Sequence, residues 1–175
     1  MKTLLPFFFC FFSSTIVFSQ ENYPIPEKTA TRLFYIQHSN NHNTYVYDAS
    51  MDGVSINFKN PINEYRIVYT EGGVKKPLSN IQKQFAYGMN TKIIAPNLRE
   101  MHLAASSKLK FYLIHNPNQR PKVYVTINNR KLYLEKIFVE LEDSSSSIKT
   151  KAKYVLFSGK DFISGANVTE KLIVE

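Results

Sequence analysis

The feature that most limits the possible folds is a series of apolar runs, each of strand length, separated by turn residues. Aromatic and β-branched residues are common in these runs, a pattern typical of β-sheets. The runs cover residues 32–37, 44–49, 62–70, 108–115, 122–127, 130–141, 151–159 and 169–175. The sequence therefore predicts a mainly β fold, a single antiparallel β domain of about eight strands. Whether it is a curved sheet, a sandwich or a partly closed barrel stays open.

A tight hairpin is predicted between two of these runs. Asn128 and Asn129 alone separate 122–127 from 130–141. Asparagine tolerates the positive φ angles of a two-residue turn, so the two runs should pair as neighbours.

The run 130–141 changes its alternation part of the way along. Leu132 and Leu134 share one face, whereas the apolar residues from Ile137 onward have the opposite parity. Strict alternation would turn one of the two sets away from the core. We expect a β-bulge near Glu135 and Lys136, because one extra residue restores the register.

One segment has helical rather than strand spacing. Its apolar residues recur three and four positions apart, at Leu78, Ile81, Phe85 and Met89. Ser79 and Gln82 are spaced as a capping box, and Gly88 is placed to end a helix. The pattern predicts one amphipathic helix near 78–88 with its apolar stripe on the sheet.

The amino terminus has the features of a secretory signal peptide. A single basic residue, Lys2, precedes the apolar run Leu4–Phe12, and a small residue, Ser19, precedes the expected cleavage point. The apolar run is too short for a membrane anchor, which needs about 20 residues. We expect cleavage after residue 19, export to the periplasm or medium, and no transmembrane segment in the mature chain.

The remaining chain divides into a leader and one domain. Residues 20–31 form a proline-marked, extended leader, and 32–175 form the single β domain. The one cysteine, Cys10, lies inside the signal peptide, so the mature protein has no disulfide.

The chain is basic, with a formal net charge of +8, one unit of which belongs to Lys2. A basic protein often binds nucleic acid, but export excludes that partner. An anionic glycan, a lipid headgroup or an envelope protein fits better. Lys149, Lys151 and Lys153 alternate along one strand face and are the candidate anion-binding residues. The alternative is that such lysines protect a strand edge from pairing.

Two segments could bind a metal. His38 and His42 are four residues apart, but the asparagines around them favour a polar loop between two strands. Asp48–Gly53 alternates oxygen-bearing residues before a glycine, as in a calcium loop, yet Lys59 stands where a bidentate glutamate is required. We expect no metal site and no cofactor, with calcium at Asp48–Gly53 left open.

Signals for catalysis are weak. The chain has no G-x-S-x-G motif, and the S-x-x-K match from Ser146 to Lys149 lies in a serine-rich loop. Glu140 and Glu142 share a strand face and could work as an acid–base pair if burial separated their pKa values. Solvated charge at a strand end is the simpler interpretation.

Three quoted stretches resemble one family. "LFYIQHSNNHNTYVYDA", "INEYRIVYTEGG…LSNIQKQFAYG" and "FSGKDFISGANVTEKL" together are similar to the DUF4833 family of exported bacterial proteins, found mainly in Bacteroidota. The resemblance covers about residues 31–173. It implies domain extent and export, and it implies no activity, because the family has none established.

Two functions remain open. The first is a non-enzymatic exported envelope protein that binds a ligand or partner through a basic surface. The second is a hydrolase acting on envelope material, which needs two or more of these residues to converge: His38, His42, His102, His115, Glu140 and Glu142.

Overall fold

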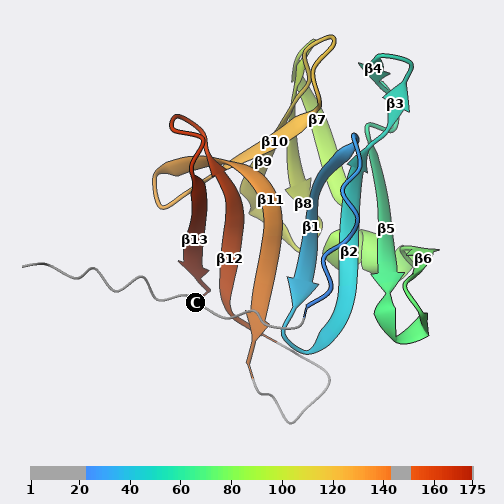
Figure 1. Ribbon diagram of the computed structural model, residues 1–175, viewed down its shortest axis with the longest axis vertical. Helices are drawn as coiled ribbons and strands as arrows, with labels where there is room; N and C mark the ends of the chain where they lie inside the picture. Colours follow the sequence, from blue (N-terminus) through green and yellow to red (C-terminus); the bar gives the residue numbers. More distant parts are fainter. Residues whose placement is uncertain (1–22, 143–150, 175) are drawn as a thin grey trace, which may run out of the picture.

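The structure, a computed structural model, describes residues 23–142 and 151–174. The expected signal peptide at 1–19 lies outside this range. Strands dominate the described residues and form a curled sheet (Figure 1). In chain order they are β1 (Arg32–His38), β2 (Asn41–Ala49), β3 (Met51–Asp52), β4 (Ser55–Ile56), β5 (Ile62–Val68), β6 (Val74–Pro77), β7 (Met89–Ala95), β8 (Leu98–Leu103), β9 (Ser106–Ile114), β10 (Lys122–Ile127), β11 (Arg130–Leu141), β12 (Ala152–Asp161) and β13 (Asn167–Ile173). The helical turns are η1 (Tyr69–Glu71), α1 (Asn80–Gln82) and η2 (Lys83–Tyr87).

Eleven strands form one sheet, in the order β6-β5-β2-β1-β11-β10-β9-β8-β7, with β12 and β13 added beside β11. Strands β3 and β4 form a separate hairpin. The pairing of β1 with β11 is parallel, so the sheet is mixed. The prediction of about eight antiparallel strands was therefore wrong in number and in direction. The missed strand β7 is exposed on both faces and so shows no alternation.

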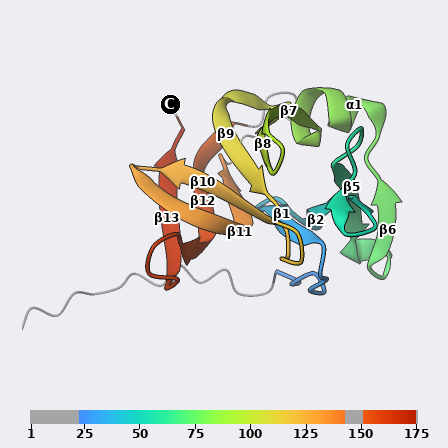
Figure 2. The same cartoon turned by 90° about the horizontal axis from the view of Figure 1, so that it is seen from above.

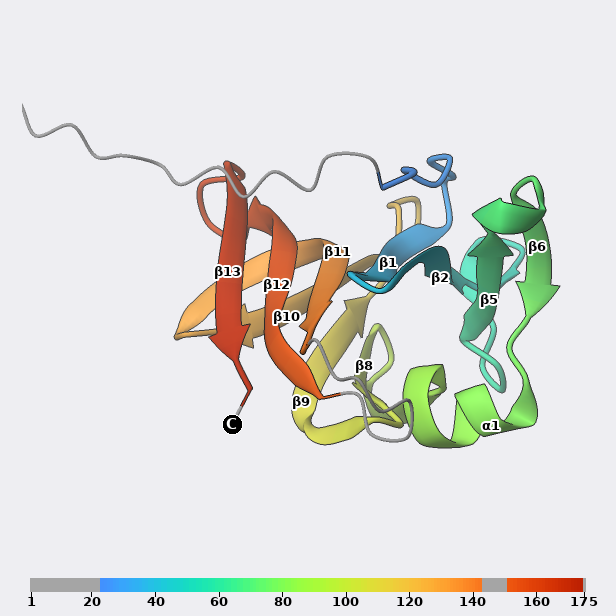
Figure 3. The ribbon, with the colours of Figure 1, turned by 90° about the horizontal axis from the view of Figure 1, so that it is seen from below.

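The sheet curls into a half-barrel around one core. Phe34 stacks on Tyr47, with ring centroids 4.5 Å apart, and on Phe111, at 5.8 Å. All three rings are buried. The chain leaves one end of the sheet path at β6 and returns at the other end at β7. In Figures 2 and 3 the helical segment between them lies across the opening of the half-barrel.

The local signals for the helix are confirmed at both ends. The Ser79 hydroxyl accepts a hydrogen bond from the Gln82 amide at 3.2 Å, and the Gln82 side chain accepts one from the Ser79 amide at 3.0 Å. A Cβ on Gly88 would lie 2.0 Å from the Lys83 carbonyl oxygen. Close approach, rather than a positive φ, therefore requires glycine there. None of the helical segments in the described part of the chain is long and apolar enough to cross a membrane.

The predicted orientation of this helix was wrong. Ile81 and Phe85 are 72% and 65% exposed, although their spacing indicated a buried stripe. After α1 the chain widens into the π-helical turn η2, and the wider turn changes the phase of the side chains that follow it, Phe85 among them. Leu78, before the helix, is buried. Tyr47 donates a hydrogen bond to the Tyr87 carbonyl at 2.7 Å, so the segment is attached to the sheet by its ends.

The predicted hairpin is confirmed. Strands β10 and β11 pair in antiparallel register from Ile127 and Arg130 outward. Asn128 and Asn129 have φ angles of 49° and 64°, as a two-residue turn with a right-handed twist requires.

Candidate functional site

The sheet divides at β11. Residues Arg130–Tyr133 of this strand pair with β10, and Lys136–Val139 pair with β1. Both partners lie along the same edge, because β12 occupies the other edge over most of the strand. Strands β10 and β1 therefore separate from each other beside Leu134 and Glu135. We call this point of separation the fork.

The predicted β-bulge is confirmed at this point. The pairing of β11 with β12 shifts between Leu134 and Lys136, which leaves Glu135 as the extra residue. Gly159 lies opposite, and a Cβ there would be 1.9 Å from the Tyr133 carbonyl oxygen. Only glycine allows the two backbones to approach so closely.

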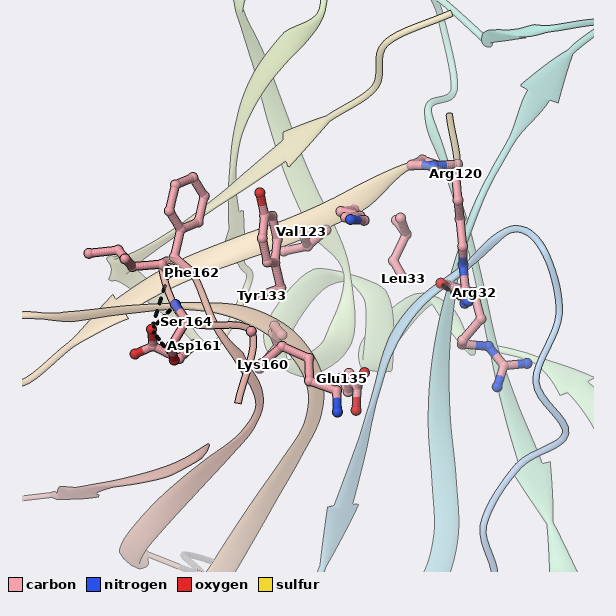
Figure 4. Close-up of a pocket in the computed structure, with 15 residues that line it drawn as sticks. Arg32, Leu33, Arg120, Val123, Tyr133, Glu135, Lys160, Asp161, Phe162 and Ser164 are labelled. Atoms are coloured by element: carbon pink, nitrogen blue, oxygen red, sulfur yellow. Dashed lines mark hydrogen bonds between the residues drawn. The ribbon is translucent and has the colours of Figure 1, made fainter. Parts of the chain in front are cut away.

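A cleft of about 500 Å³ lies over this fork (Figure 4). Tyr133 and Leu134 contribute from β11, Arg120 from the β9–β10 loop, Lys122 from the start of β10, and residues 160–165 from the end of β12 and its loop. A second pocket of about 250 Å³ shares its lining at Arg32, Leu33, Arg120 and Glu135. The two adjoin and extend toward Lys28 in the leader.

Positive charge in the cleft exceeds negative charge. Two charged residues of the cleft are paired with other charged residues of the protein. Arg32 is neutralised by Asp48, at 2.6 Å. Asp161 is bound by Arg130 at 2.9 Å and accepts the Ser164 amide at 2.9 Å. These hydrogen bonds lower the pKa of Asp161 far below its usual value.

The remaining charges face solvent. Arg120 donates one hydrogen bond to the Arg32 carbonyl at 2.8 Å, which fixes its guanidinium while other donors stay available. Lys122 is exposed, Lys160 contacts the Asn167 side chain, and Glu135 is the exposed acid of the cleft.

Aromatic rings line the side of the cleft near the β12–β13 loop. Tyr133 and Phe162 stack with centroids 4.8 Å apart. The Lys122 ammonium lies 4.8 Å from the Tyr133 ring centre. Lys131 lies 3.7 Å from the Phe162 ring centre and 3.8 Å from that of Tyr124. Cations over aromatic faces are held without carboxylates, so their charge is not cancelled.

The lysines predicted to bind anions are elsewhere. Lys151 and Lys153 are exposed at the start of β12, whereas Lys160 enters the cleft near the end of that strand. Lys149 lies outside the described residues. The structure therefore does not place the predicted stripe in the cleft.

The interpretation of both histidines as loop residues was wrong. His38 ends β1 and pairs with Asn41, and His42 lies in β2. The Nε2 atom of His38 lies 3.1 Å from the Tyr87 hydroxyl, and burial lowers the pKa of His38 to about 4. His42 is exposed and meets the Tyr23 ring edge-on. The polar turn is shorter than expected because the strands continue through the asparagines.

The calcium-loop hypothesis conflicts with the surroundings of Asp48. Its two carboxylate oxygens accept from Arg32, at 2.6 Å, and from the Tyr65 hydroxyl, at 3.0 Å. Asp52 pairs with Ser55 at the end of the β3–β4 hairpin, and Gly53 lies in its turn. Within residues 23–142 and 151–174, no group of three or more His, Cys, Asp and Glu side chains is arranged to hold a metal ion.

The residues of the hydrolase hypothesis are distributed over several elements. They lie in β1 and β2 (His38, His42), in β8 and after β9 (His102, His115), and at the end of β11 (Glu140, Glu142). Tyr23 is common to two of them, because its ring meets His42, and partial burial together with the nearby Glu140 charge raises the pKa of Tyr23. None of the six lines the cleft at the fork.

Sequence reasoning missed the cleft residues Arg120, Lys122, Tyr133 and Phe162. The predicted hairpin at Asn128 could have indicated part of the cleft, because its register sets Tyr124 opposite Tyr133. No local sequence pattern predicts the fork itself.

Comparison with known proteins gave one finding. The model of a family described as a domain of unknown function, DUF4833, matches residues 34–171. Neither the curated proteins nor the solved structures yielded a significant match.

Proposed function

The chain belongs to the DUF4833 family, and because that family has no assigned function, we propose from the geometry of the cleft that the protein is an exported, non-enzymatic binding domain for an anionic glycan. Export is supported by the signal-peptide pattern before residue 20. The basic composition is consistent with an anionic partner in the envelope.

The observation that carries the proposal is the pairing of free cations with aromatic rings in one cleft. Arg120 presents a planar guanidinium suited to a carboxylate or phosphate group. Tyr133 and Phe162 line another part of the same cleft, where the apolar C–H face of a sugar ring can pack. A volume of about 500 Å³ is within the range of small-ligand sites.

The geometry also gives a reason for binding without catalysis. A glycosidase needs two carboxyl groups across the scissile bond. Asp161 is held ionised by Arg130 and the loop amides, so it is a poor proton donor. Glu135, the other acid of the cleft, is exposed to solvent on the bulge.

The test is calorimetric titration of the mature chain with uronic acid oligosaccharides and with their neutral counterparts. We expect binding of the acidic series alone, weakened by added salt because the cations are exposed. Arg120→Ala should lower affinity by about tenfold or more, since hydrogen bonds to charged groups are strong. Lys153→Ala, an exposed lysine outside the cleft, is the matched control.

Equal binding of neutral and acidic sugars, or an unchanged affinity in Arg120→Ala, would contradict the proposal. Shortened oligosaccharides in the same samples, detected by mass spectrometry, would favour the hydrolase alternative.

A further inference from the structure

Two hairpins bring exposed apolar side chains to one end of the half-barrel. Figure 1 shows the β3–β4 hairpin and strand β7 reaching the same end. Val54 and Phe58, at and after the first hairpin, are 70% and 73% exposed. Ile93 and Ile94, near the end of β7, are also exposed. Large apolar groups clustered at loop tips indicate an interaction surface.

A pocket of about 230 Å³ lies between the two hairpins. Ser55 and Ile56 of β4 line one side, and Asn97 and Arg99 of the β7–β8 turn and β8 line another. His115, which follows β9, also lines the pocket. The Arg99 guanidinium lies 5.6 Å from the Phe58 ring centre, which joins the pocket directly to the exposed apolar tip.

Charge at this end is mainly positive. Lys59 follows the first hairpin and Lys92 lies in β7, and both are exposed like the apolar tips. Of the nearby acids, Glu100 is paired with Lys110 at 3.1 Å, and Asp52 is exposed at the hairpin tip. An excess of cations around apolar tips complements a negatively charged surface.

We propose that this end of the half-barrel docks on an anionic lipid bilayer. The pocket takes the phosphate of a lipid headgroup on Arg99, and Val54 and Phe58 enter the interface between headgroups and acyl chains. Apolar burial combined with attraction to anionic lipid is the established physics of peripheral binding. A second copy of the chain fits less well, because its identical basic end would be repelled.

The position of the surface relates it to the cleft at the fork. The loop between β9 and β10 contributes His115 and Pro117 to the pocket and Arg120 to the cleft. A protein docked by this end holds the cleft near the membrane surface. The docking inference rests on its own residues and does not depend on the glycan.

The experiment is co-sedimentation of the mature chain with phosphatidylcholine vesicles, with and without phosphatidylglycerol. The wild type should bind the anionic vesicles alone. The double variant Val54→Ser/Phe58→Ser should bind at least about tenfold more weakly, because it loses the apolar burial. Ile81→Ser/Phe85→Ser is the matched control, since those side chains have similar exposure on the helical segment, and it should bind as the wild type does.

Charge variants separate the two parts of the surface. Lys59→Ala and Lys92→Ala should each weaken binding by about fivefold, and Arg99→Gln should reduce the preference for phosphatidylglycerol. Soluble glycerol phosphate in excess should compete for the wild type. Equal binding to both vesicle types, an equal loss in the Ile81/Phe85 control, no effect of Arg99→Gln, or a dimer by light scattering that Phe58→Ser abolishes would each overturn the proposal.

Discussion

At the scale of single residues, the partly buried His38 is the titratable group expected to make stability depend on pH. Its Nε2 atom lies 3.1 Å from the Tyr87 hydroxyl, so the neutral ring can accept that proton, and protonation would remove the acceptor. Burial lowers the pKa of His38 to about 4, against about 6.5 in the unfolded chain. The unfolded state therefore binds more protons between these two values.

Stability should accordingly fall as the pH drops from about 6.5 to about 4, and the contribution of His38 should be fully present above that window. The shift corresponds to at most about 3 kcal/mol. In His38→Gln, which keeps an acceptor without a titrating ring, this part of the pH dependence should disappear. Urea unfolding at several pH values measures it. Parallel curves of unfolding free energy against pH for the two proteins would contradict the assignment, because all the other titratable residues are common to both.

At the scale of elements, the helical segment can be tested through its unexpected orientation. Leu78→Ala should reduce the free energy of unfolding by about 2–4 kcal/mol, because Leu78 is only 5% exposed. Ile81→Ala should change it by less than about 0.5 kcal/mol, since that side chain is in solvent. Chemical denaturation of the two variants provides the comparison. The amphipathic pattern read from sequence predicts a large loss in both, so a costly Ile81→Ala would restore the original interpretation.

Elements with a strong local cause were predictable. The Asn128-Asn129 turn needs positive φ, and the parity change around Glu135 needs a bulge, so both follow from a few adjacent residues. Strand β6, whose exposed residues include Lys75, and strand β7 have no buried face, and hence no periodicity to detect. The capping box at Ser79 was visible for the same local reason, whereas the π-helical turn that reoriented Phe85 was not.

At the scale of the whole molecule, the candidate site depends on pairings that local patterns do not reveal. Alternation is the same in parallel and antiparallel strands, so nothing in β1 indicates that Tyr35 will pair with Lys136. The cleft exists because β1 and β10 share one edge of β11. The predicted cations were those of a lysine stripe that is visible in the sequence, whereas Arg120, Lys122 and Lys160 line one cleft only because strands distant in the sequence pair with β11.

The fork also determines how the molecule should unfold. Strands β12 and β13 branch from the main sheet path, yet Phe157 belongs to the same buried cluster as Phe34 and Phe111. A shared core predicts one cooperative transition. Because the chain has no tryptophan, Phe162→Trp on the branch and Tyr69→Trp near β5 can each supply a single fluorescent reporter.

Urea titrations of these two reporter variants, followed by fluorescence and by circular dichroism, should give coincident transitions within each protein. We expect no independent transition of the branch, because Phe157 of β12 lies in the same buried cluster as Phe34 of β1 and Phe111 of β9. If the Phe162→Trp fluorescence changed at lower urea than the circular dichroism while the Tyr69→Trp signals coincided, β12 and β13 would unfold first. The cleft between them and β1 would then be a locally unstable site rather than a preformed one.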